Sequence, residues 1–307
     1  MAQLNSRMKR MFTGDRPAYA LIFSAGCLWG MIGIFVNQLN ACGASPAFLS
    51  FLRVSLACVM LAGMTAFRCG IRSLLVPWRT LLICALLGLV CQGFFNLFYS
   101  MAILRAGVMV SAVLLYLAPL FTAVASRLLF KEEIGSRKRL ALLVNILGCA
   151  LAATGGNLSL AGVSAVGLLF GVGAGFCYSM NAVIGKIAGE RTNVFVINTY
   201  SYLFAALFLL LFTHPLRDAP AISPKLLTWG VLYALVPTAI AYLIYFTGVQ
   251  RIAESSRVPV VASVETVVAA IVGVVLYGES MGGFHLLGIL LVLSSILMMS
   301  ASPSKSS

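Results

Sequence analysis

The chain has 307 residues, of which 61% are hydrophobic and only 9% are charged, too few charges to cover the surface of a soluble protein. The formal net charge of +13 would indicate a nucleic-acid partner in a soluble chain. Here the basic residues lie in short connections between apolar runs, which is typical of a multi-pass membrane protein and argues against nucleic acid as a partner.

Ten apolar runs follow one another along the chain. Each is close to the roughly 20 residues that a helix needs to cross a bilayer, although the fifth and tenth are shorter. The runs are continuously apolar instead of alternating, which favours helices over a β-barrel. We predict transmembrane helices over residues 18–39, 46–67, 79–101, 107–130, 139–155, 163–187, 194–213, 225–247, 256–277 and 283–300.

The basic residues predict the orientation of these helices. With the N-terminus in the cytoplasm, seventeen of the 21 Lys and Arg residues fall in inner segments. Arg105, Arg217 and Lys225 fall in outer segments, and Arg53 lies inside the second helix. Since cytoplasmic connections carry an excess of Lys and Arg, we expect both termini to be cytoplasmic.

The chain contains a weak copy of itself. "VSAVLLYLAPLFTAVASRLLFKEE" (110–133) aligns without gaps with "RVPVVASVETVVAAIVGVVLYGES" (257–280), and "GCLWGMIGIFVN" (26–37) has the spacing of "GFCYSMNAVIGK" (175–186). The copies are five helices apart, so the second half crosses the membrane in the opposite sense. We predict a cytoplasmic tail (1–17), two inverted five-helix repeats (18–155 and 156–300) around a central cavity, and a second cytoplasmic tail (301–307).

These features resemble the drug/metabolite transporter superfamily, EamA-like branch. Trp29 and Gly30 in the first helix, Pro46 and Arg53 in the second, and the two aligned segments carry the resemblance. It implies a cavity lined mainly by helices 1, 3, 4, 6, 8 and 9, with helices 2 and 7 flanking it and helices 5 and 10 peripheral. The family often has a proline after the glutamate of the ninth helix. Thr266 stands there instead, so a proline-dependent break in that helix is not expected.

Glu265 is the sharpest candidate for a functional residue. It falls about 13 Å into the ninth helix at 1.5 Å per residue, where an ionised carboxylate costs at least about 2–3 kcal/mol. Either it faces the cavity and binds a substrate amine or a proton, or it belongs to a buried structural pair. Arg53, the other intramembrane charge, is interpreted as structural, through helix packing or by reaching outward, although a pair with Glu265 is open.

Further candidates for the substrate-binding site are polar or aromatic residues of the predicted cavity helices. Gln92, Asn96 and Tyr99 share one face of the third helix because they are three or four residues apart. Several aromatic rings beside one carboxylate would suit an organic cation or an amino acid. The remaining candidates are Trp29, Tyr116, Tyr178, Asn181, Tyr242 and Tyr245.

The sequence carries no phosphate-binding loop, and its eight cysteines form no CxxC pair. We therefore expect no cofactor and no metal, and no enzymatic activity, because a recognisable catalytic constellation is lacking.

The prediction is a secondary transporter of the cell (inner) membrane that exports amino acids or organic amines by proton-coupled alternating access. Its partners would be a small-molecule substrate, protons and the lipid bilayer, and it would act as a monomer or homodimer. Import or uniport by the same fold is the alternative, followed by an intramembrane enzyme or a channel.

Overall fold

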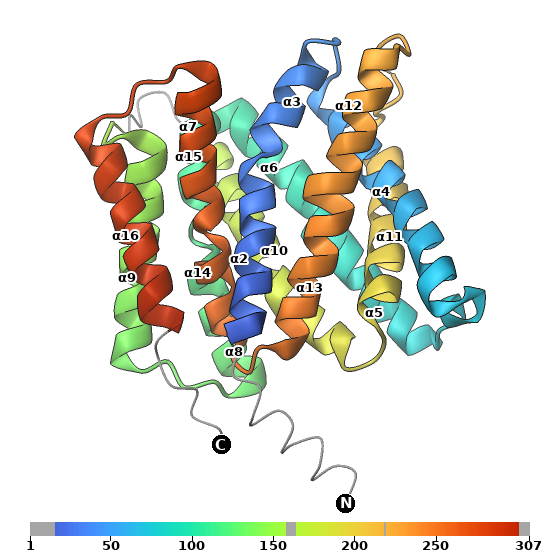
Figure 1. Ribbon diagram of the computed structural model, residues 1–307, viewed down its shortest axis with the longest axis horizontal. Coiled ribbons are helices and arrows are strands. Elements are labelled where there is room, and N and C mark those ends of the chain that lie inside the picture. The colour runs from blue at the N-terminus through green and yellow to red at the C-terminus, as the bar shows by residue number, and fades with distance from the viewer. Residues whose placement is uncertain (1–15, 158–163, 218, 301–307) are drawn as a thin grey trace, which may run out of the picture.

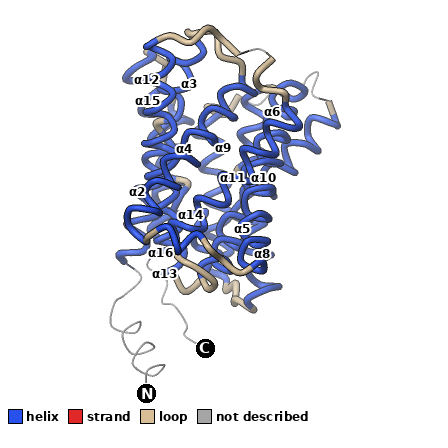
Figure 2. The backbone as a smooth tube through the Cα atoms, turned by 90° about the vertical axis from the view of Figure 1, so that its right-hand side faces the viewer, coloured by secondary structure: helices blue, strands red, loops and turns tan. Residues whose placement is uncertain are grey.

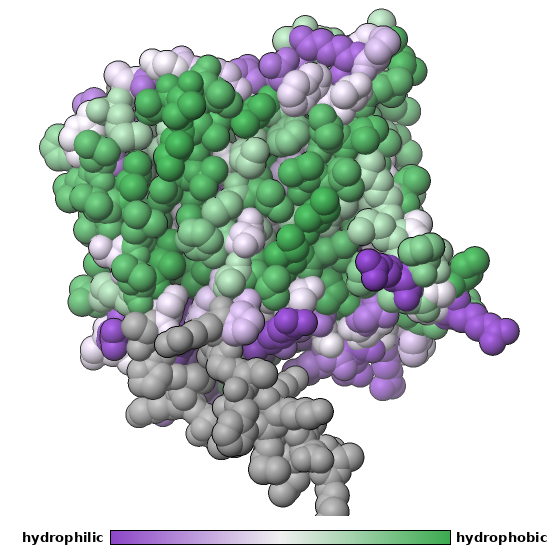
Figure 3. Space-filling model, viewed as in Figure 1, coloured by the Kyte–Doolittle hydropathy of each residue, from purple (hydrophilic) through white to green (hydrophobic). Residues whose placement is uncertain are grey.

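The computed structural model describes residues 16–157, 164–217 and 219–300, and these residues form helices without any β-strand. Nine helical stretches in this part of the chain are long and apolar enough to cross a membrane. Figure 3 shows the matching surface, a broad apolar belt with hydrophilic residues gathered along its two edges. The protein is therefore an all-helical multi-pass membrane protein, as the sequence predicts.

The first half of the chain contains eight α-helical segments. They are α2 (Arg16–Gly30), α3 (Ile32–Asn40), α4 (Pro46–Cys69), α5 (Trp78–Gly88), α6 (Phe95–Ala106), α7 (Val108–Leu115), α8 (Ala118–Phe130) and α9 (Ser136–Thr154). A 3-10 turn, η1 (Ile71–Leu74), follows α4, and a π-helical turn, η2 (Leu89–Phe94), joins α5 to α6. The helix α9 is outside the nine candidate spans, and its first turn carries Arg137, Lys138 and Arg139.

The second half contains seven α-helical segments. They are α10 (Ala165–Gly189), α11 (Val194–Thr213), α12 (Pro224–Ala234), α13 (Ala241–Arg251), α14 (Val258–Ala262), α15 (Val264–Tyr277) and α16 (Gly283–Ser300). A π-helical turn, η3 (Leu235–Ile240), joins α12 to α13, and a 3-10 turn, η4 (Ser255–Arg257), leads into α14. Side-chain caps start several helices: the Ser45, Asn193 and Ser223 side chains accept hydrogen bonds from the first turns of α4, α11 and α12.

The described chain begins and ends at the same face of the molecule. The start of α2 and the end of α16 both lie at the bottom of Figure 1, and we call this the lower face. Figure 2 shows from the side that the helices run between this face and an upper face, with the loops at the two faces. The predicted tails fall almost entirely outside the described residues, except for Arg16 and Pro17, which belong to α2.

The two halves repeat the same irregularities. The π-turn η3 begins at Leu235, 146 residues after Leu89 begins η2. The break between α14 and α15 falls at Ser263, 147 residues after Tyr116 ends α7. Figure 1 shows α2 rising from the lower face and α10 descending to it, so equivalent helices run in opposite directions. This arrangement agrees with two inverted repeats. We call the nine candidate spans and α9 rods and number them in chain order: α2–α3, α4, α5–α6, α7–α8, α9, α10, α11, α12–α13, α14–α15 and α16. Five rods belong to each half.

The rods form a central group flanked at both ends. The helices α9 and α16 pack together at one end, on the left of Figure 1, and α4, α5 and α11 pack together at the other end. Between them, α2 contacts α13, α14 and α15, and α10 contacts α6, α7 and α8. The central group therefore joins elements from both repeats.

Candidate functional site

A cavity of about 420 Å³ lies among the central helices. Its lining extends from Pro46 at the upper end of α4 and Ile103 near the end of α6 down to Trp29 and Glu265, near the middle of the rods. The lining comes from the first, second, third, fourth, sixth, eighth and ninth rods. The second rod, α4, which the family resemblance places only at the flank, thus lines the cavity directly.

Aromatic rings cluster around Trp29 at the deep end of the cavity. The ring of Trp29 lies 4.9 Å from that of Tyr242, 5.0 Å from that of Tyr245 and 6.3 Å from that of Tyr178, measured between centroids. Trp29 is buried at the end of α2, and its indole nitrogen has no hydrogen-bond partner. The indole N–H is thus a buried donor whose hydrogen bond is not made within the described part of the chain.

Glu265 lies on the cavity wall in the first turn of α15, just after the break at Ser263. Its carboxylate accepts hydrogen bonds from the Tyr178 hydroxyl at 3.3 and 3.5 Å, and it forms no ion pair with another described residue. It is partly buried and belongs to the cavity lining. Among the described residues, the structure therefore does not contain the alternative arrangement, a buried salt bridge at Glu265.

Glycine packing sets the position of Glu265. A Cβ on Gly30 would lie 2.5 Å from Cβ of Val268 and 2.7 Å from the backbone oxygen of Glu265. A Cβ on Gly26 would lie 2.6 Å from the backbone oxygen of Ala262. The Gly26/Gly30 face of α2 thus lets its backbone approach the broken ninth rod, with Trp29 beside Glu265.

The break before Glu265 forms without a proline at the position of Thr266. The Ser263 N–H bonds the Pro259 carbonyl at 3.0 Å, and the Thr266 N–H bonds the Ser263 carbonyl at 3.0 Å, which tightens the turn. Asn145 of α9 donates to the Ser263 hydroxyl at 2.6 Å and to the Ser295 hydroxyl of α16 at 2.9 Å. A buried side-chain network therefore holds the irregular turn in place of the proline.

Arg53 also lines the cavity, from the second turn of α4. Only 7% of the residue is exposed, and its guanidinium lies over the Tyr233 ring at 5.6 Å. Tyr233 itself lines the cavity from α12. No salt bridge connects Arg53 to Glu265 among the described residues.

The other predicted site residues divide into two groups. Asn96, Tyr99, Tyr116, Tyr178 and Tyr242 line the cavity. Gln92, Asn181 and Tyr245 are buried and lie outside the lining. Two of the latter support lining residues: the Gln92 carbonyl accepts a hydrogen bond from Asn96 at 2.6 Å, and Asn181 donates to the Tyr178 carbonyl at 3.1 Å.

Several cavity residues are not among those predicted from the sequence, and they include Phe95, Tyr233 and Ser50. Phe95 stacks on Tyr99, four residues later, with ring centroids 5.7 Å apart. This spacing was a usable signal. Tyr233 lies before the π-turn η3, and Ser50 lies one turn before Arg53 on α4. No spacing rule in the sequence connects these two to the cavity.

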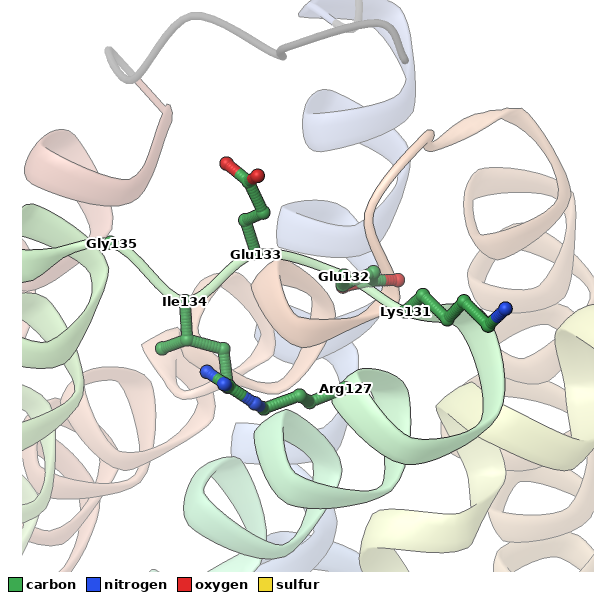
Figure 4. Close-up of a pocket in the computed structure, with 6 residues that line it drawn as sticks. All are labelled: Arg127, Lys131, Glu132, Glu133, Ile134 and Gly135. Atoms are coloured by element: carbon green, nitrogen blue, oxygen red, sulfur yellow. The ribbon is translucent and has the colours of Figure 1, made fainter.

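The lower face beneath the cavity is closed by charged groups from both repeats. Glu132, in the α8–α9 connection, accepts hydrogen bonds from the backbone N–H groups of Ser255 at 2.6 Å and Ser256 at 3.1 Å. Lys186 of α10 lies 3.7 Å from the same carboxylate. Figure 4 shows that the Glu132 side chain turns away from its neighbour Glu133. A carboxylate of the first repeat thus caps the start of the ninth rod.

A second group of charges extends this closure. Lys138 of α9 pairs with Glu254 at 2.6 Å, and Glu254 also pairs with Arg257. Arg257 is buried and donates to the Tyr19 hydroxyl of α2 at 2.9 Å and to the Met299 carbonyl of α16 at 3.2 Å. These bonds tie α2, α9, α16 and the turn before α14 together at the lower face. The cavity lining therefore reaches the upper side, while ion pairs and hydrogen bonds join the two repeats below it.

Comparisons with known proteins agree with this architecture. The model of the EamA-like transporter family matches the chain twice, over residues 16–154 and 165–301. A relative from Archaeoglobus fulgidus, described as an uncharacterized transporter, is 26% identical over 288 residues, covering 92% of this chain and 96% of its own length. The uncharacterized inner membrane transporter YicL of Salmonella typhimurium is 23% identical over 282 residues, covering 91% and 93%.

A solved crystal structure shares the fold, with a TM-score of 0.76 at 18% identity and coverage of 92% of this chain and 96% of the other. The two family matches correspond to the two repeats and together span most of the sequence. The chain is a membrane transporter protein that belongs to the EamA-like transporter family.

Proposed function

We propose that the protein is a secondary active transporter that exports amino acids or organic amines by alternating access, with both termini in the cytoplasm. The observation that carries this proposal is the position of Glu265. Among the described residues it is the only acid in the lining of the cavity, and it lies among aromatic rings near the middle of the rods. A carboxylate at this depth is costly unless it binds a cation or a proton, so the substrate ammonium and the proton would compete for it.

The proposed direction and driving force follow from this competition. A proton that enters from the upper side would neutralise Glu265 and release a cationic substrate there. Loss of the proton at the lower face would restore the charge that binds the next substrate. The second candidate function is import or uniport. The same fold would act as an importer if the transport cycle ran in the opposite direction, and as a uniporter if it ran without protons.

The test uses purified protein in proteoliposomes, with candidate substrates chosen by thermal-shift screening against metabolites. We expect saturable counterflow of the labelled substrate and proton movement, followed with a trapped pH-sensitive dye. Glu265→Gln should abolish both without preventing membrane insertion. The matched control is Glu279→Gln, an exposed acid just after α15, and it should transport like the wild type.

Four outcomes would contradict the proposal. Unchanged transport by Glu265→Gln would show that this carboxylate has no part in the mechanism. Flux without saturation or counterflow would favour a channel. If protons move in the same direction as the substrate, instead of the opposite one, the importer is favoured. If exchange continues without proton movement, the uniporter is favoured.

A further inference from the structure

The cavity wall carries a guanidinium without a counter-ion. Arg53 is 7% exposed, and no hydrogen bond or ion pair connects it to another described residue. Its Nε atom is buried and unpartnered, and its guanidinium lies over the face of Tyr233, 5.6 Å from the ring centroid. Buried arginines in proteins are normally paired, so this one requires an explanation.

A purely structural role does not account for Arg53. If its side chain reached outward to interfacial water, the residue would be well exposed, yet it is buried. If it served to join helices, its guanidinium would donate to carbonyls or carboxylates of neighbouring rods. An anion that enters the cavity would supply the missing partner, because Arg53 lines the cavity together with Ser50, one turn above it.

A second unpaired charge of opposite sign lies deeper in the same cavity. Arg53 is seven residues below the start of α4, about 10 Å at 1.5 Å per residue. Glu265 is twelve residues below the end of α15, about 18 Å. Tyr242 of the aromatic group lines the same cavity as both charges and packs on Trp29 at 4.9 Å. An occupant that neutralises both groups must itself carry a cation at its deeper end and an anion nearer the upper face.

Resting on the transport function proposed above, we propose that Arg53 binds the carboxylate of the substrate while Glu265 binds its ammonium group. The cavity then selects zwitterionic amino acids over amines that lack a carboxylate. It also selects them over carboxylic acids that lack an amine, because either partial ligand leaves one buried charge unpaired. A charge-assisted hydrogen bond corresponds to a preference of about tenfold or more in affinity.

The experiment measures binding by calorimetry to the full-length protein in detergent. The probes are the neutral L-amino acids, each with its decarboxylated amine and its deaminated acid. We expect at least one amino acid to bind about tenfold or more tightly than both of its partial analogues. If no amino acid in the panel is preferred over its own amine and its own acid, the inference is wrong.

Variants then assign the preference to Arg53. In Arg53→Gln the affinity for the amino acid should fall to that for the matched amine, whose own affinity should be almost unchanged. Arg53→Lys should keep part of the preference, because it keeps the charge and loses the paired donors. The control Arg72→Gln, an exposed arginine of η1, should behave like the wild type. A preference that survives in a folded Arg53→Gln protein would overturn the assignment.

The outcomes separate this inference from the transport function itself. If amines bind and are transported as well as amino acids, and Glu265→Gln abolishes that transport, the proposed function holds and the role of Arg53 is refuted. If no member of the panel is transported by the wild type, both fail. If Arg53→Gln does not fold, the wild-type ratios and the Arg53→Lys variant decide the question.

Discussion

The hydroxyl of Tyr178 is the one hydrogen-bond donor to Glu265 among the described residues, at 3.3 and 3.5 Å. Tyr178→Phe removes it and keeps the ring that packs on Trp29 and Phe95. We expect the affinity for a cationic substrate to change by about threefold to tenfold, the range of one hydrogen bond, while folding is retained. Calorimetric titration checks this. Tyr277→Phe, at the exposed end of α15, is the matched control and should change nothing.

Gly30 is the closest point between α2 and α15. A methyl group there would overlap Cβ of Val268 and the Glu265 carbonyl, so the helices must separate. We expect Gly30→Ala to lower the free energy of unfolding by about 1–3 kcal/mol, typical of overpacking. Thermal unfolding in detergent measures this. Gly63→Ala, in the exposed middle of α4 with open space around it, should be neutral or slightly stabilising. Equal effects at both positions would contradict the packing argument.

Much of the candidate site could be predicted residue by residue. Glu265 and Trp29 were identifiable because a charge and a large ring in the middle of an apolar run are rare and need a reason. The spacing in the sequence places Gln92 on the same helical face as Asn96 and Tyr99, but in the structure Gln92 lies outside the cavity lining. Gln92 belongs to the π-turn η2, where an extra residue in the turn rotates the face. Uniform 3.6-residue spacing therefore misplaces residues on either side of such a turn.

At the scale of elements, the apolar runs predicted the helices to within a few residues at most ends, since about 20 apolar residues are needed to cross a bilayer. Their interiors were not predictable in the same way. The ninth rod breaks at Ser263 without the proline at position 266, because the Asn145 side chain, 118 residues away in the sequence, bonds the Ser263 hydroxyl beside the local backbone bonds of the turn. Such support depends on tertiary packing and leaves no local pattern.

The connection between α8 and α9 supplies a capping group to another element. The Glu132 carboxylate accepts the Ser255 and Ser256 N–H groups at the start of the ninth rod. We expect Glu132→Ala to lower the free energy of unfolding by about 1–2 kcal/mol through loss of this cap. It should also weaken the closure of the lower face, which faster hydrogen exchange of residues 254–258 would report.

The control for this prediction is Glu190→Ala, an exposed acid at the end of α10. It carries the same charge on the same face without capping another helix. Hydrogen exchange at residues 254–258 should be unchanged in this variant. If Glu132→Ala also leaves exchange there unchanged, Glu132 does not hold the lower face closed.

The two repeats share helix packing as well as topology. Gly175 of α10 approaches the Leu114 carbonyl of α7, as Gly26 of α2 approaches the Ala262 carbonyl of α14. These contacts lie at equivalent points of the two halves, although the sequences aligned there share few identities. Helix packing needs only small residues at the crossing point, so a repeat can persist in structure after most of its side chains have diverged.

The distribution of charge predicts how the molecule sits in the membrane. The helix ends and the turn η1 at the lower face carry exposed Arg68, Arg72, Arg79, Arg127 and Arg137, whereas the α15–α16 connection at the upper face has no basic residue. Since basic residues are retained in the cytoplasm, the lower face should be cytoplasmic and the cavity should open outward in this conformation.

Reporter fusions in bacterial cells test this orientation. A green fluorescent protein fused after Ser307 should fluoresce, and alkaline phosphatase fused at Gly282, in the α15–α16 connection, should be active, because these reporters work on opposite sides of the inner membrane. The reverse pair of fusions, with the reporters exchanged, should be silent. If both reporters give signal at both positions, the chain inserts in two orientations. The positive charges would then not determine its topology, and a fixed direction of export would have no structural basis.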